Sequence, residues 1–155
     1  FWIVVDDFAA SDDKEHIAEA QFLLDADSAE IDEQTMVAAG NSQQRGRLAV
    51  VPLQTEGLSL RIAKGETEPD VRGFLPEGFE KLRPVPALLY TRRFVDNATV
   101  AYANVPFEGP KIPVYVTDEV LHVKGKSYQF KLTGTRLDIL GAAQSFGIEE
   151  SALGR

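Results

Sequence analysis

Hydrophobic and polar residues alternate along most of this chain with a period of two, which indicates strands rather than helices. The pattern is clearest over residues 58–65 (LSLRIAKG) and 111–140, where Tyr128, Phe130 and Leu132 fall on one face of a strand. Turn residues interrupt it about every 8–12 residues, as in antiparallel sandwiches. The chain is therefore predicted to be an all-β, antiparallel β-sandwich of about two sheets. Its predicted core comprises Ile3, Val5, Leu48, Val50, Leu58, Leu60, Ile62, Leu88, Val100, Val114 and Val116.

Two pairs of strands are predicted to form hairpins. Residues 46–54 and 58–65 are separated by a short Thr-Glu-Gly step, in which Gly57 can supply the positive φ of a tight turn. Residues 87–95 and 98–105 are separated by an Asp-Asn step, which is also typical of hairpins. We expect each pair to hydrogen-bond directly, and the Gly-Thr step after Thr133 to begin a further strand.

Two segments allow a second interpretation. Residues 12–25 (DDKEHIAEAQFLLD) are rich in helix formers and begin with an Asp that can cap a helix, yet their residues also alternate as in a strand. We predict a strand there, in agreement with the family resemblance described below. Residues 145–155 are predicted to form a last helical turn ending at Gly154 or to fray.

Length and composition indicate a single domain over residues 1–155, with 44% hydrophobic and 26% charged residues. The net charge of -8 argues against a nucleic-acid partner, because phosphate binding requires clustered Lys and Arg. No apolar run approaches the roughly 20 residues that span a bilayer, so no membrane partner is expected. The chain contains no Cys. It begins inside an apolar run, FWIVV, and we interpret it as a domain excised from a longer protein, with an exposed apolar edge near this run.

Motifs for catalysis and cofactors are absent from the sequence, and no cofactor or metal is predicted. The segment that starts at Asp25 lacks the Gly and the ligand positions of an EF-hand, and the carboxylates among residues 6–13 are interpreted as ordinary surface groups. His16 is the one weak catalytic candidate, while His122 and the four tyrosines are assigned structural or surface positions with wet hydroxyls. Trp2 is a weak candidate for stacking on a sugar ring.

Three blocks give the chain an outline that is similar to a known family. They are FWIVVDDF (1–8), GETEPDVRGFLPEGFEKLRPVPALLY (65–90) and NATVAYANVPFEGP (97–110). Over about residues 1–110 the chain resembles the C-terminal β-sandwich of the heparinase II/III-like polysaccharide lyases. The family often has a His at the position of His16, but a second His common in its next aromatic-His-Leu step is absent, since Leu23 follows Phe22.

The resemblance implies a non-catalytic part of a bacterial, periplasmic or secreted lyase that cleaves uronate-containing glycans by β-elimination. In that family the catalytic groups come largely from a helical α/α-toroid domain of the same chain. The implied partners are therefore that domain and an acidic polysaccharide such as a glycosaminoglycan, and the chain alone is expected to be inactive. An autonomous carbohydrate-binding module and a purely structural sandwich are the alternatives.

The long segment 66–83 is predicted to be an ordered loop, because its apolar residues are too many to leave in water. We expect it to fold back over a sheet edge or towards the helical domain, anchored by Phe74 or Phe79. These two residues are also the weak candidates for substrate binding.

Overall fold

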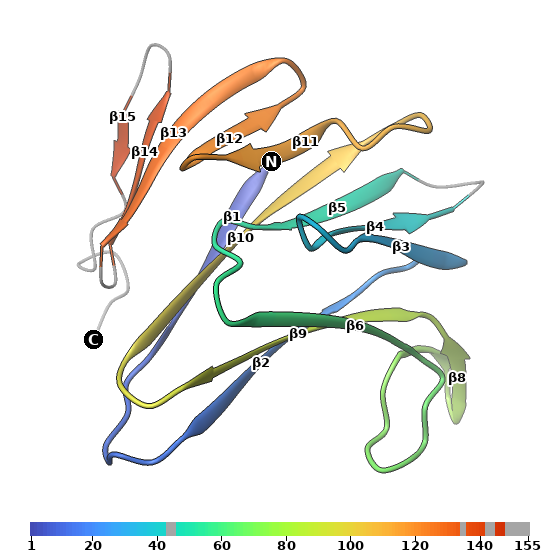
Figure 1. The fold of residues 1–155 in the computed structure, drawn as a ribbon. Coiled ribbons are helices and arrows are strands. Elements are labelled where there is room, and N and C mark those ends of the chain that lie inside the picture. The colour runs from blue at the N-terminus through green and yellow to red at the C-terminus, as the bar shows by residue number, and fades with distance from the viewer. Residues whose placement is uncertain (43–45, 134–135, 142–144, 148–155) are drawn as a thin grey trace.

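The computed structural model describes residues 1–42, 46–133, 136–141 and 145–147, and these ranges contain strands and no helix. Three antiparallel sheets are stacked as layers, with a five-stranded sheet in the middle (Figure 1). The predicted all-β antiparallel fold is confirmed. The expectation of about two sheets is wrong, because the middle sheet packs against a sheet on each of its faces.

The middle sheet has the order β1 (Trp2–Phe8), β10 (Ala98–Phe107), β5 (Arg47–Pro52), β4 (Val37–Asn41) and β3 (Ser28–Asp32). The lower sheet has the order β2 (His16–Leu23), β9 (Pro86–Phe94) and β6 (Leu58–Lys64). The upper sheet is a meander of β11 (Val114–Thr117), β12 (Val120–Val123), β13 (Lys126–Thr133), β14 (Arg136–Gly141) and β15 (Ser145–Gly147). A separate hairpin consists of β7 (Phe74–Gly78) and β8 (Lys81–Pro84).

The strand prediction for residues 12–25 is confirmed by β2. This strand pairs with β9 from His16 opposite Phe94 to Leu23 opposite Ala87. Its alternation places Phe22 in the core and Gln21 outside. Pairing with β9 and burial of one face outweigh the helix propensity of the segment, which is a weak local preference. The predicted turn at residues 134–135 and the tail from residue 148 lie outside the described residues. Residues 145–147, the start of the predicted helical turn or frayed tail, instead form strand β15 beside β14.

Both hairpin predictions are wrong. Residues 47–52 form β5 in the middle sheet, whereas 58–64 form β6 in the lower sheet, and the connection with Gly57 crosses between the layers. In the same way β9 belongs to the lower sheet and β10 to the middle one (Figure 1). Alternation and turn residues indicate that the chain reverses, but they are the same whether two strands lie side by side or face to face.

The three layers enclose two hydrophobic cores. All the predicted core residues lie in one of them: Ile3, Val5, Val114 and Val116 between the middle and upper sheets, and Leu48, Val50, Leu58, Leu60, Ile62, Leu88 and Val100 between the middle and lower sheets. Neighbouring residues of the middle sheet face opposite cores, as Ala38 and Ala39 do. The middle sheet is thus buried on both faces.

Candidate functional site

The segment that connects β6 to β7 lies across the outer face of the lower sheet. Gly73 approaches the backbone of β6 closely, since a Cβ at this position would lie 2.7 Å from the carbonyl oxygen of Ala63. It also has a φ of 71°, so glycine is required on two grounds. Its carbonyl oxygen accepts hydrogen bonds from the backbone N–H groups of Gly65 and Val85. The segment is thereby fixed to the sheet.

Arg72 holds the same segment to the sheet through its side chain. Its Nη1 lies 2.8 Å from a carboxylate oxygen of Glu19 and donates to Oε1 of Gln21 at 2.8 Å, both on β2. Beside these contacts, Ala87 and Leu89 of β9 are buried on the outer face of the lower sheet. Residues 66–83 are therefore ordered and fold back over a sheet as expected, with an arginine as one of the anchors. The prediction of a loop throughout is wrong, because β7 and β8 form a hairpin from Phe74 to Pro84.

The two phenylalanines proposed as anchors have different surroundings. Phe74 is half-buried, and its ring lies 3.7 Å from the position of a Cβ on Gly65. Phe79 is 94% exposed at the turn between β7 and β8, so it does not anchor the hairpin within this chain. The prediction that either residue binds substrate stays a prediction.

Trp2 lies in β1, an edge strand of the middle sheet, where it is half-exposed together with Phe1. The expected apolar edge near FWIVV is therefore present. Phe1 packs edge-on against Tyr128 of the upper sheet, with ring centroids 5.2 Å apart. A stacking role of Trp2 on a sugar ring remains a prediction.

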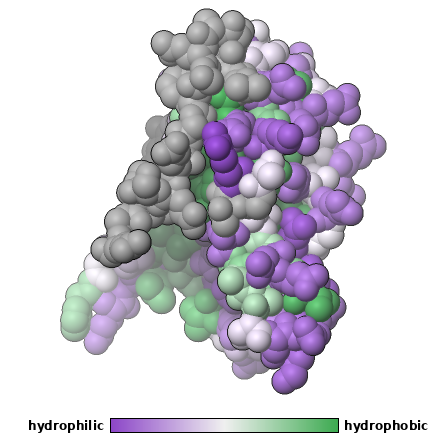
Figure 2. Space-filling view, turned by 90° about the vertical axis from the view of Figure 1, so that its left-hand side faces the viewer, coloured by the Kyte–Doolittle hydropathy of each residue, from purple (hydrophilic) through white to green (hydrophobic). Residues whose placement is uncertain are grey.

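His16 has a partner that the sequence interpretation did not anticipate. Its Nε2 lies 2.9 Å from Oδ1 of Asp12, and its ring lies 5.4 Å from that of Phe94. A carboxylate that orients an imidazole is one element of a general base. The only sign of this pair in the sequence is that Asp12 and His16 are four residues apart. Figure 2 shows the face of the molecule that lies on the left in Figure 1, where hydrophilic and hydrophobic areas alternate over the described residues.

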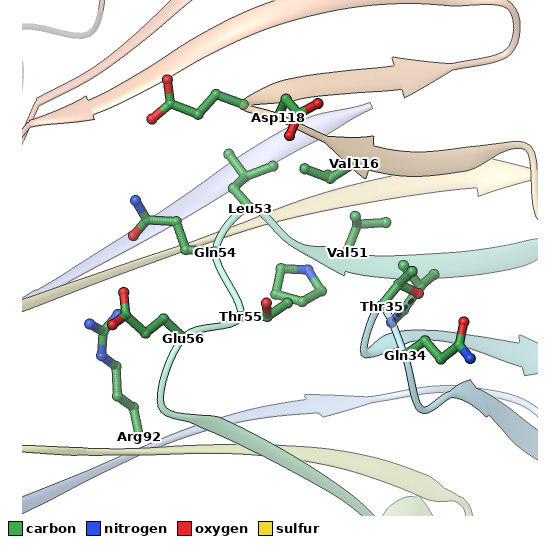
Figure 3. Close-up of a pocket in the computed structure, with 13 residues that line it drawn as sticks. Gln34, Thr35, Val51, Leu53, Gln54, Thr55, Glu56, Arg92, Val116 and Asp118 are labelled. Atoms are coloured by element: carbon green, nitrogen blue, oxygen red, sulfur yellow. Dashed lines mark hydrogen bonds between the residues drawn. The ribbon is translucent and has the colours of Figure 1, made fainter.

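A cleft of about 440 Å³ opens where the three layers meet (Figure 3). Arg92 and Glu56 lie on its lower side, and Asp118 of the β11–β12 turn lies above them. The cleft also contains Thr35 and Gln54, so hydrogen-bonding groups surround it. None of its described lining residues is His, Cys, Lys or Tyr. Its groups suit hydrogen bonding to a polar ligand better than transfer of a proton at neutral pH.

The tyrosines of the lower core were expected to have wet hydroxyls, and for Tyr90 this is wrong. Tyr90 is fully buried and donates to the carbonyl oxygen of Met36 at 2.9 Å. Burial raises the pKa of Tyr90, and the pKa of Tyr102 is raised by burial and by the carboxylate of Asp6. Their hydroxyls are neutral and enclosed, which does not suit an accessible acid or base.

Comparison with known families, with curated proteins and with solved structures finds no match to this chain. Within the described ranges, no group of three or more His, Cys, Asp or Glu side chains is placed to hold a metal ion. The same residues include no helix long and apolar enough to cross a membrane.

Proposed function

We propose that this chain is the non-catalytic β-sandwich portion of a heparinase II/III-like polysaccharide lyase. In this role it packs on the helical catalytic domain of the same protein and forms one wall of the glycan cleft. The support from sequence is the resemblance over residues 1–110. The support from the structure is the distribution of exposed apolar side chains.

Several exposed apolar residues lie on β2 or on the part of the chain that follows β6. Of nine large hydrophobic residues that are exposed in the described ranges, two are on β2 (Ile17 and Leu23), one precedes β7 (Val71) and two are in the β7–β8 hairpin (Phe79 and Leu82). Phe79 stands at the tip of a hairpin that ion pairs of Arg83 with Asp25 and Glu77 hold in place. Ordered apolar groups in contact with water are typical of a surface that meets another domain. This is the observation that carries the proposal.

The test compares this chain with the longer protein that its gene encodes. We expect the longer protein to release unsaturated uronate from heparan sulfate, hyaluronan or alginate, measured by ultraviolet absorbance, and the chain alone to release none. Phe79→Ala is expected to lower the Tm of the longer protein, because it removes an interdomain contact. The same substitution should leave the Tm of the isolated chain unchanged, since Phe79 is 94% exposed there.

Tyr115→Ala is the matched control, because Tyr115 is also an exposed aromatic residue but lies in the upper sheet. It should change both Tm values by the same amount, because its ring contact with His122 lies within this chain. A gene that encodes no helical domain, or eliminase activity of the isolated chain, would contradict the proposal.

A further inference from the structure

Strand β1 forms an open edge of the middle sheet. It pairs with β10 over its whole length, from Trp2 to Phe8, and no other strand of the described ranges lies on its free side (Figure 1). Every residue of β1 keeps some exposure to solvent, whereas residues 100–105 of the neighbouring β10 are buried. The free side of β1 is therefore accessible.

Alternate residues of β1 direct their backbone N–H and C=O groups to this free side. In an antiparallel sheet each residue bonds to one neighbouring strand, and successive residues bond to opposite sides. The carbonyl oxygen of Ala101 in β10 accepts a hydrogen bond from the N–H of Leu53, so Ala101 bonds on the side away from β1. Its register partner is Val5. The backbone groups of Val5, and with it those of Ile3 and Asp7, therefore point to the open edge.

This edge lacks the features that usually keep edge strands from pairing, which are charged side chains, Pro, bulges and short length. The other edges have them: charged residues stand inside β2 (Glu19), β3 (Glu30) and β6 (Arg61), and β11 and β15 have only four and three residues. Strand β1 is apolar over residues 2–5, contains no Pro and keeps a regular register. It is suited to receive a further strand.

The carboxylate of Asp6 indicates which kind of strand would fit. Asp6 lies on the lower side of β1, because its register partner is Val100 of the lower core. It is half-buried and close enough to Tyr102 to help raise the pKa of that tyrosine. It forms no hydrogen bond or ion pair with a described residue. A carboxylate in this position favours a cationic partner, since a charge-assisted hydrogen bond would then satisfy it.

We propose that β1 binds an extended segment of a separate polypeptide, which adds to the middle sheet as an antiparallel strand and places a Lys or Arg against Asp6. In this mode of recognition backbone hydrogen bonds supply affinity, and alternate side chains supply specificity. Aliphatic side chains of the segment lie beside Ile3 and Val5, which face the upper core. The site contains no residue of β2 or of the β7–β8 hairpin, so it does not rest on the proposed function.

The test is titration of the chain with the end-blocked peptide Thr-Thr-Lys-Val-Thr-Val-Val. Its lysine lies opposite Asp6 when its first residue lies opposite Phe8. Calorimetry measures the affinity, and NMR measures the exchange of backbone amide protons. We expect the N–H groups of Ile3 and Val5 to exchange more slowly with the peptide bound, because they become hydrogen-bonded. The N–H of Val4, which faces β10, should not change.

Methylation of single peptide nitrogens tests the edge without altering the protein. The N–H of the fourth peptide residue, opposite Val5, points to β1. Its methylation should therefore weaken binding at least about tenfold. The N–H of the fifth peptide residue points away from β1. Methylation there is the matched control and should have a much smaller effect.

The role of Asp6 is tested by charge. Replacing the lysine of the peptide by Glu should weaken binding about fivefold. Asp6→Asn should remove this difference between the two peptides and leave the slower amide exchange in place. Asp13→Asn changes an exposed carboxylate outside β1 and should preserve the difference.

Absence of binding, equal effects of the two methylations, or a preference for lysine that Asp6→Asn leaves intact would overturn the proposal. Binding by this chain but not by the longer protein would also overturn it, since a segment of that protein would then occupy the edge. A dimer of the chain in sedimentation that the peptide does not dissociate would assign the edge to a second copy, with the same consequence. None of these outcomes depends on eliminase activity, which tests the proposed function.

Discussion

The hydroxyl of Tyr90 lies in the core between the middle and lower sheets, close to the backbone carbonyl oxygens of Met36 and Val50 at 2.9 and 3.2 Å. A buried hydroxyl without a partner is costly, so these contacts allow the tyrosine to occupy the core. The rings of Phe22 and Tyr102 pack against Tyr90 with centroids 5.9 and 5.0 Å away. Burial of both tyrosines raises their pKa values, which makes stability depend on pH in the alkaline range.

We predict that the free energy of unfolding falls above about pH 10, by up to about 1.4 kcal/mol per pH unit for each buried tyrosine. Below that pH both states keep the protons and the stabilisation is complete. As the pH rises towards the higher folded-state pKa, only the unfolded chain releases its protons, so the stabilisation is lost. Tyr90→Phe should cost about 1–2 kcal/mol at neutral pH and make the alkaline fall shallower. Urea denaturation from neutral to alkaline pH measures both, and an unchanged alkaline slope would contradict the prediction.

At the scale of elements, the β7–β8 hairpin is held by a short list of contacts. Gly73 allows the backbone to approach β6, Arg72 reaches across to β2, and the ring of Phe74 packs near Gly65. Phe79 contributes nothing comparable because it stands in solvent at the tip. The hairpin therefore has an anchored base and a free tip.

We predict that Phe74→Ala lowers the free energy of unfolding of the isolated chain by about 2 kcal/mol, as expected for a half-buried aromatic ring. Phe79→Ala, the matched control in the same hairpin, should change it by less than about 0.5 kcal/mol. Chemical denaturation of the two variants gives the comparison. Equal effects of the two substitutions would show that Phe74 is not an anchor.

At the scale of the whole molecule, the middle sheet separates two cores and is covered on both faces. Small side chains are frequent where it is buried, and Ala38, Ala39, Ala49 and Ala103 are fully inaccessible to solvent. Small residues let three layers approach each other closely, and such an interior tolerates little added volume.

We predict that Ala103→Leu destabilises the protein by about 3 kcal/mol, because the added methyl groups displace residues of the upper core. Ala9→Leu adds the same volume at an exposed position and should have an effect below about 0.5 kcal/mol. Thermal or urea denaturation of both variants measures the difference. A stable Ala103→Leu protein would mean that the layers are less closely packed than the structure describes.

Sequence alone determined the class of the fold and the membership of the core. Alternation depends on the pleat of each strand, so it predicted the strands of the upper sheet and the buried positions without knowledge of neighbours. For β2 the same residues also suit a helix, and the family resemblance decided the prediction of a strand. Residues 66–83 are ordered as predicted, but not for the predicted reason. Val71, Phe79 and Leu82 are exposed, and Gly73, Arg72 and the pairing of β7 with β8 hold the segment.

Only the tertiary structure decided which strands pair and which stack. Gly57 and the Asp-Asn step after Val95 reverse the chain, but local turn chemistry does not distinguish a hairpin from a connection between two layers. In the structure both turns connect the middle sheet to the lower sheet. Arg72 meets Glu19 because the segment between β6 and β7 folds back over the lower sheet. Tyr115 stacks on His122 because the register of β11 and β12 places the two residues opposite each other. These depend on long-range pairing, which the pattern of hydrophobic positions constrains to one face of a strand but not to one partner.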